Sequence, residues 1–541
     1  MKVMDLKKSV LTGVTLAISG VSLVALTPNK AQASSVLNWS EPTELQTLDV
    51  SKVLDTVSSD MLGSSMEGLY RLGNNSEVTP GIAEKTEVSD DGLTYTFTLR
   101  KNAKWSNGDP VTAKDFVYSW QRTVNPKTGS EYAYLFNGVK NAEAVNKGEK
   151  PLSELGVKAD GDYKLVVSLE HQVPYFKKLM GFTIFFPQNE NAVKKYGKKY
   201  GTQAKYTVYN GPFQLKDWNG SNLSWKLVKN KSYWDKKNVK LSEANFQVNK
   251  STSTSYNLFQ SGKLDSTYLN SEQAKQLKNK PEFVSREQGR MNYLELNENN
   301  KLFKNEKVRQ AVSYAVNRKQ LVDHVLGNGS LAPEGIVSKG LMKYDGKDFA
   351  DAAKTKEGVS YDAKKAQKLW VEGLKEAGVK NPSITLVGDD TDVAKNVTEY
   401  LQSQLQTNLK GLKVKVLNVP MKNRISRAQE GKFDLILSGW GADFSDPISF
   451  LDLFTSDNAQ NYGKWSNEEY DKLIKASKTT DAGNPAKRWD DMVQASKVLS
   501  QNQGVVPLYQ LSQATMMNKN VKGLVYNTAG IQYNFKEVNV K

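Results

Sequence analysis

Alternating hydrophobic and polar positions in the first half of the chain predict β-strands. LTYTFTLR (93–100) and YKLVVSL (163–169) alternate with a period of two, and an Asp-Gly pair precedes each of them. Such a pair is typical of a tight turn, so each segment is expected to be a strand that follows a turn. GPFQLKDW (211–218) and LSWKLVKN (223–230) continue the same pattern. The first half is therefore expected to be rich in β-structure.

Hydrophobic positions spaced three and four residues apart predict helices. After Pro110, Thr112 is followed three residues later by Asp115, which is the spacing of a capping box at the start of the helix DFVYSWQRTV. The segment KVRQAVSYAVNRKQLVDHVL (307–326) repeats its apolar residues at helical spacing, and we expect it to be helical along its length.

Short hydrophobic runs alternate with helical segments in the second half. SITLV (383–387), VKVLNV (414–419) and FDLIL (433–437) read as buried strands, and a helical pattern separates each run from the next. This alternation predicts βαβ units and a parallel sheet, which is an α/β fold. The loop SGWGADFSDP (438–447) then emerges from the carboxyl end of the last strand, where open α/β sheets bind ligands.

The composition of this loop indicates a place where a ligand is held. Trp440 stands between Gly439 and Gly441, and the carboxylate of Asp443 follows two residues later. Glycine lets a ligand approach the backbone closely, and a tryptophan ring offers it an apolar face. Asp446 comes directly before a proline and is instead expected to form a turn.

Three further aromatic residues are candidates for ligand contact. Tyr132 and Tyr134 lie in GSEYAYLF, and Trp465 follows a Gly-Lys pair, so all three have polar, loop-like surroundings. Rings in such settings line ligand clefts, because they offer apolar faces without long flexible stems.

Enzymatic chemistry has little support in the residue types present. The chain has two histidines, His171 and His324, and no cysteine. A Ser-His-Asp triad needs one of these histidines, and no Gly-x-Ser-x-Gly elbow stands nearby. Thiol chemistry is excluded and a soft-metal site is not expected, whereas spacing alone leaves a carboxylate pair for glycoside hydrolysis open. These residue types therefore give no reason to expect catalytic residues, a metal or a cofactor.

The first 33 residues have the order of a secretory signal peptide. Lys2, Lys7 and Lys8 precede an uncharged, mostly apolar stretch at 9–26, and the triplet Ala-Gln-Ala ends at Ala33. This order predicts export and cleavage after Ala33; a retained membrane anchor is the alternative. Without a cysteine, the protein is not expected to carry a lipid anchor on that residue.

The net charge of +16 bears on partners rather than on the fold. The lysines are scattered over many expected helices, and export removes nucleic acid as the usual partner of a basic protein, so no nucleic-acid binding is expected. Most of the lysines are expected to form solvated surface. An exported basic protein is also attracted to anionic cell-wall polymers or lipid head groups.

Several motifs resemble the solute-binding proteins of peptide and nickel ABC importers. The most specific is KWSNGDPVTAKDFVYSW, which lies within a matching stretch at 79–124. MEGLYRL (66–72), YNGPFQL (209–215), KVRQAVSYAVNR (307–318) and VVPLYQ (505–510) match in the same order. The matches cover nearly the whole chain after residue 33 and favour the oligopeptide-binding branch.

The resemblance implies a two-lobed, Venus-flytrap fold of the type II periplasmic-binding-protein class, with an additional inserted domain. A length of 541 residues is enough for about three or four domain-sized units. Mapped onto the motifs, domain I is discontinuous, domain II is the insertion, domain III is the second lobe, and the hinge lies near residues 296 and 505. The expected ranges are 34–72, 205–296 and 505–541 for domain I, 73–204 for domain II and 297–504 for domain III.

The resemblance also implies a role for the loop. In oligopeptide-binding relatives, a tryptophan–x–x–aspartate loop receives the amino terminus of the peptide, and the matching position here is Asp443. The carbonyls of Gly439 and Gly441 are expected to add hydrogen bonds, and the peptide backbone to pair as an added strand. The expected function is a monomeric exported receptor that delivers oligopeptides to a membrane permease. Oligosaccharide binding, pheromone binding and a role as a basic surface adhesin remain alternatives.

Overall fold

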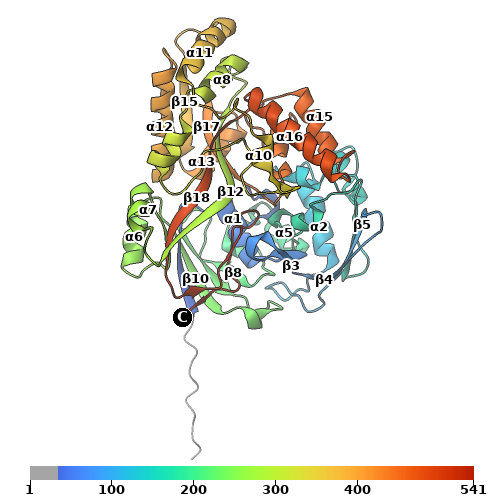
Figure 1. Cartoon of the computed structure of the whole chain (residues 1–541). Coiled ribbons are helices and arrows are strands. Elements are labelled where there is room, and N and C mark those ends of the chain that lie inside the picture. Colours follow the sequence, from blue (N-terminus) through green and yellow to red (C-terminus); the bar gives the residue numbers. More distant parts are fainter. Residues whose placement is uncertain (1–34) are drawn as a thin grey trace, which may run out of the picture. The chain divides into compact units, whose positions relative to one another are not determined.

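Two long strands, β12 (Phe283–Leu296) and β18 (Val506–Met517), are inner strands of the largest sheet. They pair antiparallel, with register shifts between Glu287 and Met291 and between Asn292 and Tyr293. In the computed structural model, which describes residues 35–541, they run side by side through the middle of the molecule (Figure 1). They belong to a six-stranded sheet of order β11-β18-β12-β17-β15-β16. Its other strands are β11 (Ser266–Tyr268), β17 (Leu435–Gly441), β15 (Ser383–Asp389) and β16 (Lys413–Val419).

The strands β17, β15 and β16, at one end of this sheet, form the predicted βαβ units. β15 pairs parallel with both β16 and β17, and the connections are the helices α12 (Asp392–Asn408) and α13 (Met421–Gln429). Leu386, Leu401 and Leu435 are fully buried between these helices and the strands. The prediction of a parallel sheet is therefore confirmed, and the hydrophobic stripe of α12 is what binds it to the sheet.

β17 is longer than the sequence predicted. Its pairing with β12 continues through Gly439, Trp440 and Gly441, which stand opposite Asn292, Met291 and Arg290. The prediction that these three residues lie in a loop is therefore wrong, because the partner strand extends the pairing beyond the hydrophobic run. The loop begins only at Ala442.

The segment 307–326 is not one continuous α-helix. It forms α8 (Glu306–Tyr314), α9 (Arg318–Gln320) and a π-helix at Leu321–Leu326. The break lies at Asn317, whose side chain accepts a hydrogen bond from the backbone N–H of Gln320, 3.0 Å away. Asparagine favours this capping arrangement over a helix interior, so local chemistry interrupts the hydrophobic period.

A second sheet has the order β1-β10-β9-β8. β1 pairs parallel with β10, and β9 pairs antiparallel with both β10 and β8. The rings of Trp39, Trp225, Phe246 and Phe535 pack against one another in the adjoining core. The strands are β1 (Ser35–Glu41), β10 (Leu241–Val248), β9 (Ser224–Lys229) and β8 (Phe213–Lys216), so the strands expected near residues 211–230 are confirmed.

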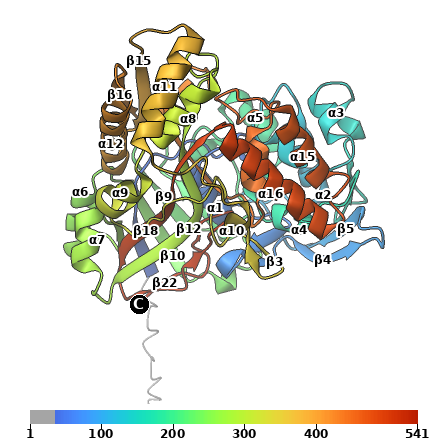
Figure 2. The ribbon, with the colours of Figure 1, turned by 45° about the horizontal axis from the view of Figure 1, so that its top comes forward.

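A third sheet, β4-β5-β7-β6, belongs to the stretch expected to be an insertion. α2 (Ala113–Val124) packs beside it and begins with the predicted capping box: the backbone N–H of Thr112 donates to Asp115 Oδ2 at 2.7 Å. Figures 1 and 2 both place α15 (Glu468–Lys478) and α16 (Pro485–Gln501) next to this part. The strands are β4 (Ala83–Val88), β5 (Thr94–Leu99), β7 (Lys164–Ser168) and β6 (Val157–Ala159).

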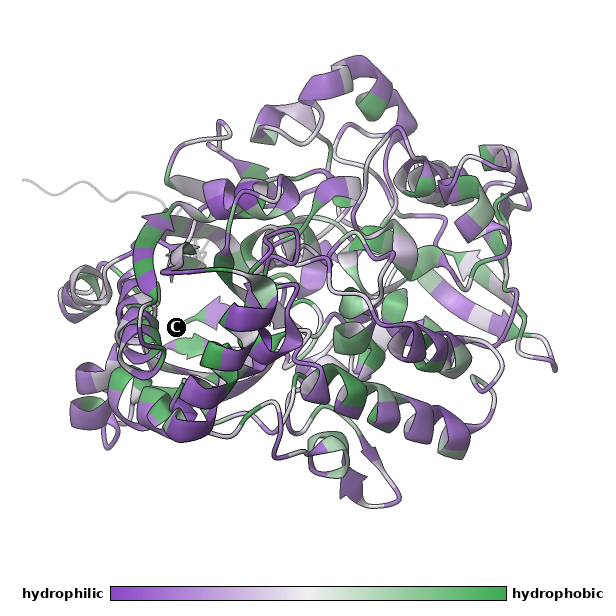
Figure 3. Cartoon of the chain, turned by 90° about the horizontal axis from the view of Figure 1, so that it is seen from above, coloured by the Kyte–Doolittle hydropathy of each residue, from purple (hydrophilic) through white to green (hydrophobic). Residues whose placement is uncertain are grey.

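The described chain contains further α-helices and β-strands, most of them short. Figure 3 shows long hydrophilic stretches on the peripheral helices, whereas hydrophobic residues gather on strands and inner helix faces. No helix within residues 35–541 is long and apolar enough to cross a membrane, and the predicted signal peptide at 1–33 lies outside the described residues. The remaining elements are α1 (Thr56–Ser65), β2 (Tyr70–Leu72), β3 (Val78–Pro80), α3 (Ala142–Asn146), α4 (Phe176–Leu179), α5 (Glu190–Tyr196), α6 (Thr252–Gln260), α7 (Ser271–Leu277), β13 (Lys343–Tyr344), β14 (Lys347–Asp348), α10 (Phe349–Ala353), α11 (Ala363–Ala377), α14 (Ile448–Leu451), β19 (Val521–Lys522), β20 (Val525–Tyr526), β21 (Tyr533–Asn534) and β22 (Asn539–Val540).

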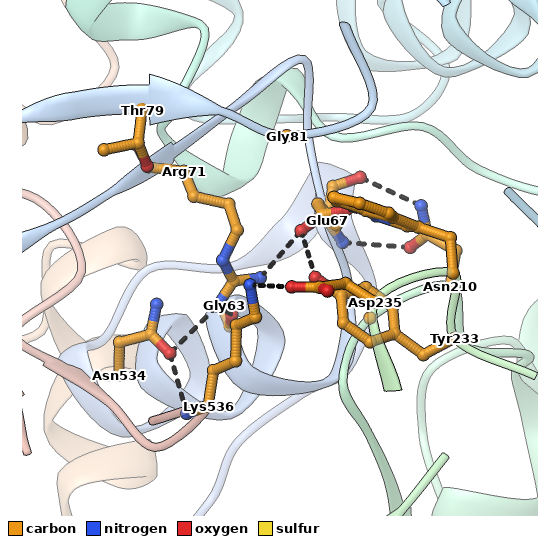
Figure 4. Close-up of polar contacts among 12 residues, drawn as sticks. Gly63, Glu67, Arg71, Thr79, Gly81, Asn210, Tyr233, Asp235, Asn534 and Lys536 are labelled. Atoms are coloured by element: carbon orange, nitrogen blue, oxygen red, sulfur yellow. Dashed lines mark hydrogen bonds and ion pairs between the residues drawn. The ribbon is translucent and has the colours of Figure 1, made fainter. Parts of the chain in front are cut away.

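A buried polar network joins three distant stretches of the chain (Figure 4). The carboxylate of Glu67, fully buried, accepts hydrogen bonds from Tyr233 at 2.7 Å and from the guanidinium of Arg71 at 3.3 Å. Arg71 also donates to Asn534 Oδ1 at 2.9 Å, and Asn210 pairs with the backbone of Glu67. The network therefore ties the motif MEGLYRL to the segments near residues 210–235 and 534.

Candidate ligand-binding site

A cavity of about 360 Å³ is lined by residues of the six-stranded sheet and by Tyr132 and Phe182 from the stretch expected to be an insertion. Its wall includes the end of β17, the end of β1, the start of α1 and the ring of Tyr132. The volume is within the range of small-ligand sites. Of the predicted site residues, Tyr132, Gly439, Trp440, Gly441 and Asp443 line it.

One edge of β17 is open toward this cavity. β12 pairs with β17 from Leu435 to Gly441, but β15 pairs with the opposite edge only at Leu435 and Ile436. Within the described chain, no strand pairs with that edge from Leu437 to Gly441, and these residues line the cavity. An exposed strand edge is a template for another extended chain.

Asp443 follows directly after this open edge. Its side-chain atom Oδ1 accepts a hydrogen bond from the hydroxyl of Tyr132 at 2.9 Å, and its backbone N–H donates to Ser449 Oγ at 2.7 Å. The residue is 5% exposed, and Oδ2 has no hydrogen-bond partner among the described residues. Burial raises the pKa of this carboxyl well above its usual range, against smaller opposing effects of hydrogen bonds from Tyr132 and Ser449. The ionised form therefore lacks a counter-charge that a cationic ligand group would supply.

Aromatic rings form the wall beside Asp443. The ring centroid of Tyr132 lies 5.8 Å from that of Trp440 and 5.6 Å from that of Phe182. Tyr134 stacks on Tyr132 at 6.1 Å but does not itself line the cavity. Tyr134 thus lies behind the wall and supports the orientation of Tyr132.

Trp465 lies away from the cavity. The residue is 2% exposed, and its ring packs edge-on against Tyr470 at 5.1 Å, over Gly504. The polar residues around Trp465 in the sequence suggested a loop, but the side chain lies in the core. We therefore leave Trp465 out of the proposed ligand contacts. Asp446 accepts a hydrogen bond from the backbone of Ile448, as a turn residue does, and also pairs through both oxygens with the buried Arg488 at 2.8 and 3.0 Å.

The other charged residues that line the cavity were not predicted from the sequence. Arg290 has no carboxylate partner within 4.0 Å in the described chain, and its Nη2 donates to the carbonyl of Gly439 at 3.3 Å. Arg424 pairs with Asp389 at 2.7 Å. The remaining acidic lining residues are Glu41, Asp55, Asp60 and Glu295. No motif links these positions, because the fold alone brings them together.

Ion pairs and hydrogen bonds join segments that lie far apart in the chain. The ammonium of Lys250 lies 2.7 Å from Asp390 Oδ2 and 2.6 Å from Glu44 Oε1. Lys178 donates to the carbonyl of Ser445 at 2.7 Å. Glu131 accepts hydrogen bonds from Gln429 and Tyr462. Lys250 and Tyr462 also line the cavity.

The family described as "Bacterial extracellular solute-binding proteins, family 5 Middle" matches residues 77–462. The chain belongs to this family. It is 39% identical to the dipeptide-binding protein of Lactococcus lactis subsp. cremoris over 97% of this chain and 98% of that protein. It is also similar to the structure of Listeria monocytogenes OppA bound to peptide, with a TM-score of 0.90 and 39% identity over 94% of this chain and 99% of that one. The predicted two-lobed α/β fold with an additional domain is confirmed for this family 5 protein.

One further family member distinguishes two arrangements of the lobes. The Escherichia coli murein tripeptide binding protein MppA, 27% identical, matches with a TM-score of 0.84 in one structure and 0.61 in its unliganded open form. Both comparisons cover 94% of this chain, and the two structures cover 99% and 98% of their own length. The lobes of this family 5 protein are therefore arranged differently from those of the open form, in agreement with the contacts of Lys250 and Lys178.

Proposed function

We propose that the protein captures peptides between its lobes and delivers them to the membrane permease of an ABC importer. The observation that carries this proposal is the unpaired, buried Oδ2 of Asp443 at the end of an open strand edge. A relative that is named a dipeptide-binding protein and a structural neighbour bound to peptide support the same ligand class. No covalent step is part of this function.

The geometry of the cavity supports main-chain recognition. A peptide whose α-ammonium contacts Asp443 Oδ2 can extend its backbone along Leu437–Gly441 as an added strand. Tyr132 holds the other carboxylate oxygen in place. The Gly439 carbonyl is already in contact with Arg290, so Gly441 is the better-placed of the two glycines for a backbone contact. This binding mode selects peptides by the direction of the chain and by its main-chain contacts. It does not depend on the sequence of side chains.

We also propose the domain boundaries that the sequence predicted. The network of Glu67, Tyr233 and Asn534 supports a discontinuous domain I built from 34–72, 205–296 and 505–541, with 73–204 as domain II and 297–504 as domain III. We place the hinge within β12 and β18, near the register shift between Glu287 and Met291, because pairing is interrupted there. The crossing would thus lie a few residues inside the predicted boundaries at 296 and 505.

The proposed site of action is the cell envelope. Relatives from the same family are named periplasmic, and the family is extracellular, so the protein acts outside the cytoplasmic membrane. We propose that residues 1–33 direct export and that the net charge, +16 for the full sequence and +13 without residues 1–33, draws the monomeric protein to anionic polymers of the cell envelope.

Acetylation of the peptide amino terminus tests the ammonium contact. We expect an N-acetylated tripeptide to bind at least about 100-fold more weakly than the free tripeptide, since a buried carboxylate would lose its cation. Isothermal titration calorimetry measures both affinities. The matched control is the Nα-methylated tripeptide, which keeps its charge and should retain most of the affinity. Equal binding of acetylated and free peptides would show that the ammonium is not read.

The Lys250 contact is expected to stabilise the closed form. Lys250→Met removes the pair with Asp390 and should weaken peptide binding about threefold to tenfold, mainly through faster dissociation, because the pair is partly exposed. Stopped-flow displacement measures the dissociation rate. Lys415→Met is the control, because Lys415 is exposed and has no ion pair among residues 35–541. Equal effects in both variants would assign the loss to net charge rather than to closure.

A further inference from the structure

A second group of carboxylates lines the cavity on the wall formed by the first lobe. Glu41 ends β1, Asp55 caps the amino terminus of α1, and Asp60 lies within α1. All three line the same cavity as Asp443. We call Glu41, Asp55 and Asp60 the acidic wall.

The carboxylates of the acidic wall have few hydrogen-bond partners within the described chain. Asp60 Oδ1 accepts from the backbone N–H of Tyr533 at 3.1 Å, and Asp55 Oδ1 accepts from that of Ser58 at 2.9 Å. Asp55 Oδ2 is buried without a partner. Glu41 is 5% exposed, and its carboxylate has no hydrogen bond or ion pair within residues 35–541. The indole N–H of Trp39 lies near enough to lower the pKa of Glu41 without completing a hydrogen bond.

Within residues 35–541, no basic side chain forms an ion pair with Glu41, Asp55 or Asp60. Lys250, a lysine of the cavity lining, forms ion pairs with Glu44 and Asp390. Arg286 lies over the rings of Tyr526 and Tyr533. Burial, opposed by Trp39 and reinforced by the charge of Asp55, raises the pKa of Glu41 to about 8. Carboxylates held in this way gain most from a cation that enters the cavity.

The surroundings fit an organic cation better than a metal ion. Within residues 35–541, no three acidic or histidine side chains are close enough together to hold a metal. Tyr268 lies near both Glu41 and Asp60, whose charges add to burial in raising the pKa of its hydroxyl. Tyr268, Leu54 and Val57 line the cavity there and can cover an aliphatic stem or face a cation.

The acidic wall is within reach of a peptide held at Asp443. The backbone N–H of Gly530 donates to the carbonyl of Ala442, next to Asp443, and Tyr533 contacts Asp60. Tyr533 is the third residue after Gly530, so their Cα atoms are at most about 11 Å apart. A side chain within the first few residues of such a peptide spans that distance.

We propose that the acidic wall binds the ammonium or guanidinium group of a lysine or arginine side chain near the amino terminus of the ligand. This proposal rests on the proposed peptide-binding function and names its preferred substrates as basic peptides. In this proposal, Asp443 binds the α-ammonium of the peptide and Glu41 binds the cationic group of the side chain.

Calorimetry with the full chain tests the preference. The probes are tripeptides of alanine in which one position carries lysine or its uncharged analogue norleucine, at position one, two or three. We expect the lysine peptide to bind about tenfold more tightly than the norleucine peptide at one position, from a charge-assisted hydrogen bond. Equal affinity of lysine and norleucine at every position overturns the acidic-wall proposal but leaves peptide capture intact. Failure of all the peptides to bind refutes peptide capture itself.

Three variants locate the effect. Glu41→Gln and Asp55→Asn should each lower the lysine-to-norleucine affinity ratio toward one; asparagine also caps helices, so Asp55→Asn keeps α1 intact. Glu272→Gln, on the exposed face of α7, changes the charge equally and should leave the ratio as it is. A ratio that falls equally in Glu272→Gln, or that stays unchanged in both wall variants, overturns the proposal. Two wall variants keep the test decisive if one of them fails to fold.

Discussion

Replacing Asp443 by alanine should weaken peptide binding by about 2–5 kcal/mol, the usual effect of removing one partner of a buried charge pair. The side chain is 5% exposed, and the Oδ2 atom that would meet the ammonium has no other partner among the described residues. The loss should appear mainly as faster dissociation, because the contact forms only when the peptide is fully seated. Calorimetry and stopped-flow displacement with one tripeptide measure both quantities.

Asp443→Asn separates charge from shape in this experiment. The amide can still accept the hydrogen bond from Tyr132, but it cannot neutralise an ammonium. We expect it to lose most of the affinity that the alanine variant loses. The free protein should be no less stable with asparagine, because a buried carboxylate with a raised pKa is itself unfavourable. Undiminished affinity in Asp443→Asn would remove this carboxylate from the ligand site.

Local patterns predicted the elements whose stability depends on their own hydrophobic face. β5 and β7 appear where alternation indicated strands, and α2 begins at the predicted capping box. β15, β16 and β17 also follow their hydrophobic runs, because the helices between them leave only a parallel connection. In each case the signal and its physical cause lie within the same short stretch of chain.

Long-range partners decided the features that the sequence could not specify. Trp440 lies in a strand because β12 pairs with it, and residues 291 and 440 are far apart in the chain. Trp465 is buried because α15 brings Tyr470 against it. The helical pattern around Asn317 is interrupted by a cap next to Arg318, which donates to the carbonyl of Pro507 at 2.6 Å. None of these contacts leaves a periodic signal.

The charged lining of the cavity was equally hidden. Glu41 and Arg424 lie in unremarkable local contexts, and only the fold brings both to the cavity. The composition of the loop indicated that it holds a ligand, whereas the specific role of Asp443 came only from the resemblance to a family. A carboxylate's role depends on its burial and its partners, and both are properties of the folded chain.

Replacing Glu67 by alanine should lower the free energy of unfolding by about 3–5 kcal/mol, because it leaves a buried guanidinium without its carboxylate. The hydroxyl of Tyr233 and the indole N–H of Trp234 would lose their acceptor at the same time. Chemical denaturation monitored by tryptophan fluorescence measures the change. The damage should be structural, because Glu67 does not line the cavity.

The double variant Glu67→Met/Arg71→Met decides whether the charge itself is responsible. Removing both charges from the network of Figure 4 leaves no unpaired ion, so the double variant should be more stable than Glu67→Ala. Arg71 also donates to Asn534, so part of the loss should remain. If the double variant is as unstable as the single one, the network acts through the packing of its side chains, and the ion pair is not what joins the segments near residues 67, 233 and 534. Recovery in the double variant would instead identify the uncompensated guanidinium as the main source of instability.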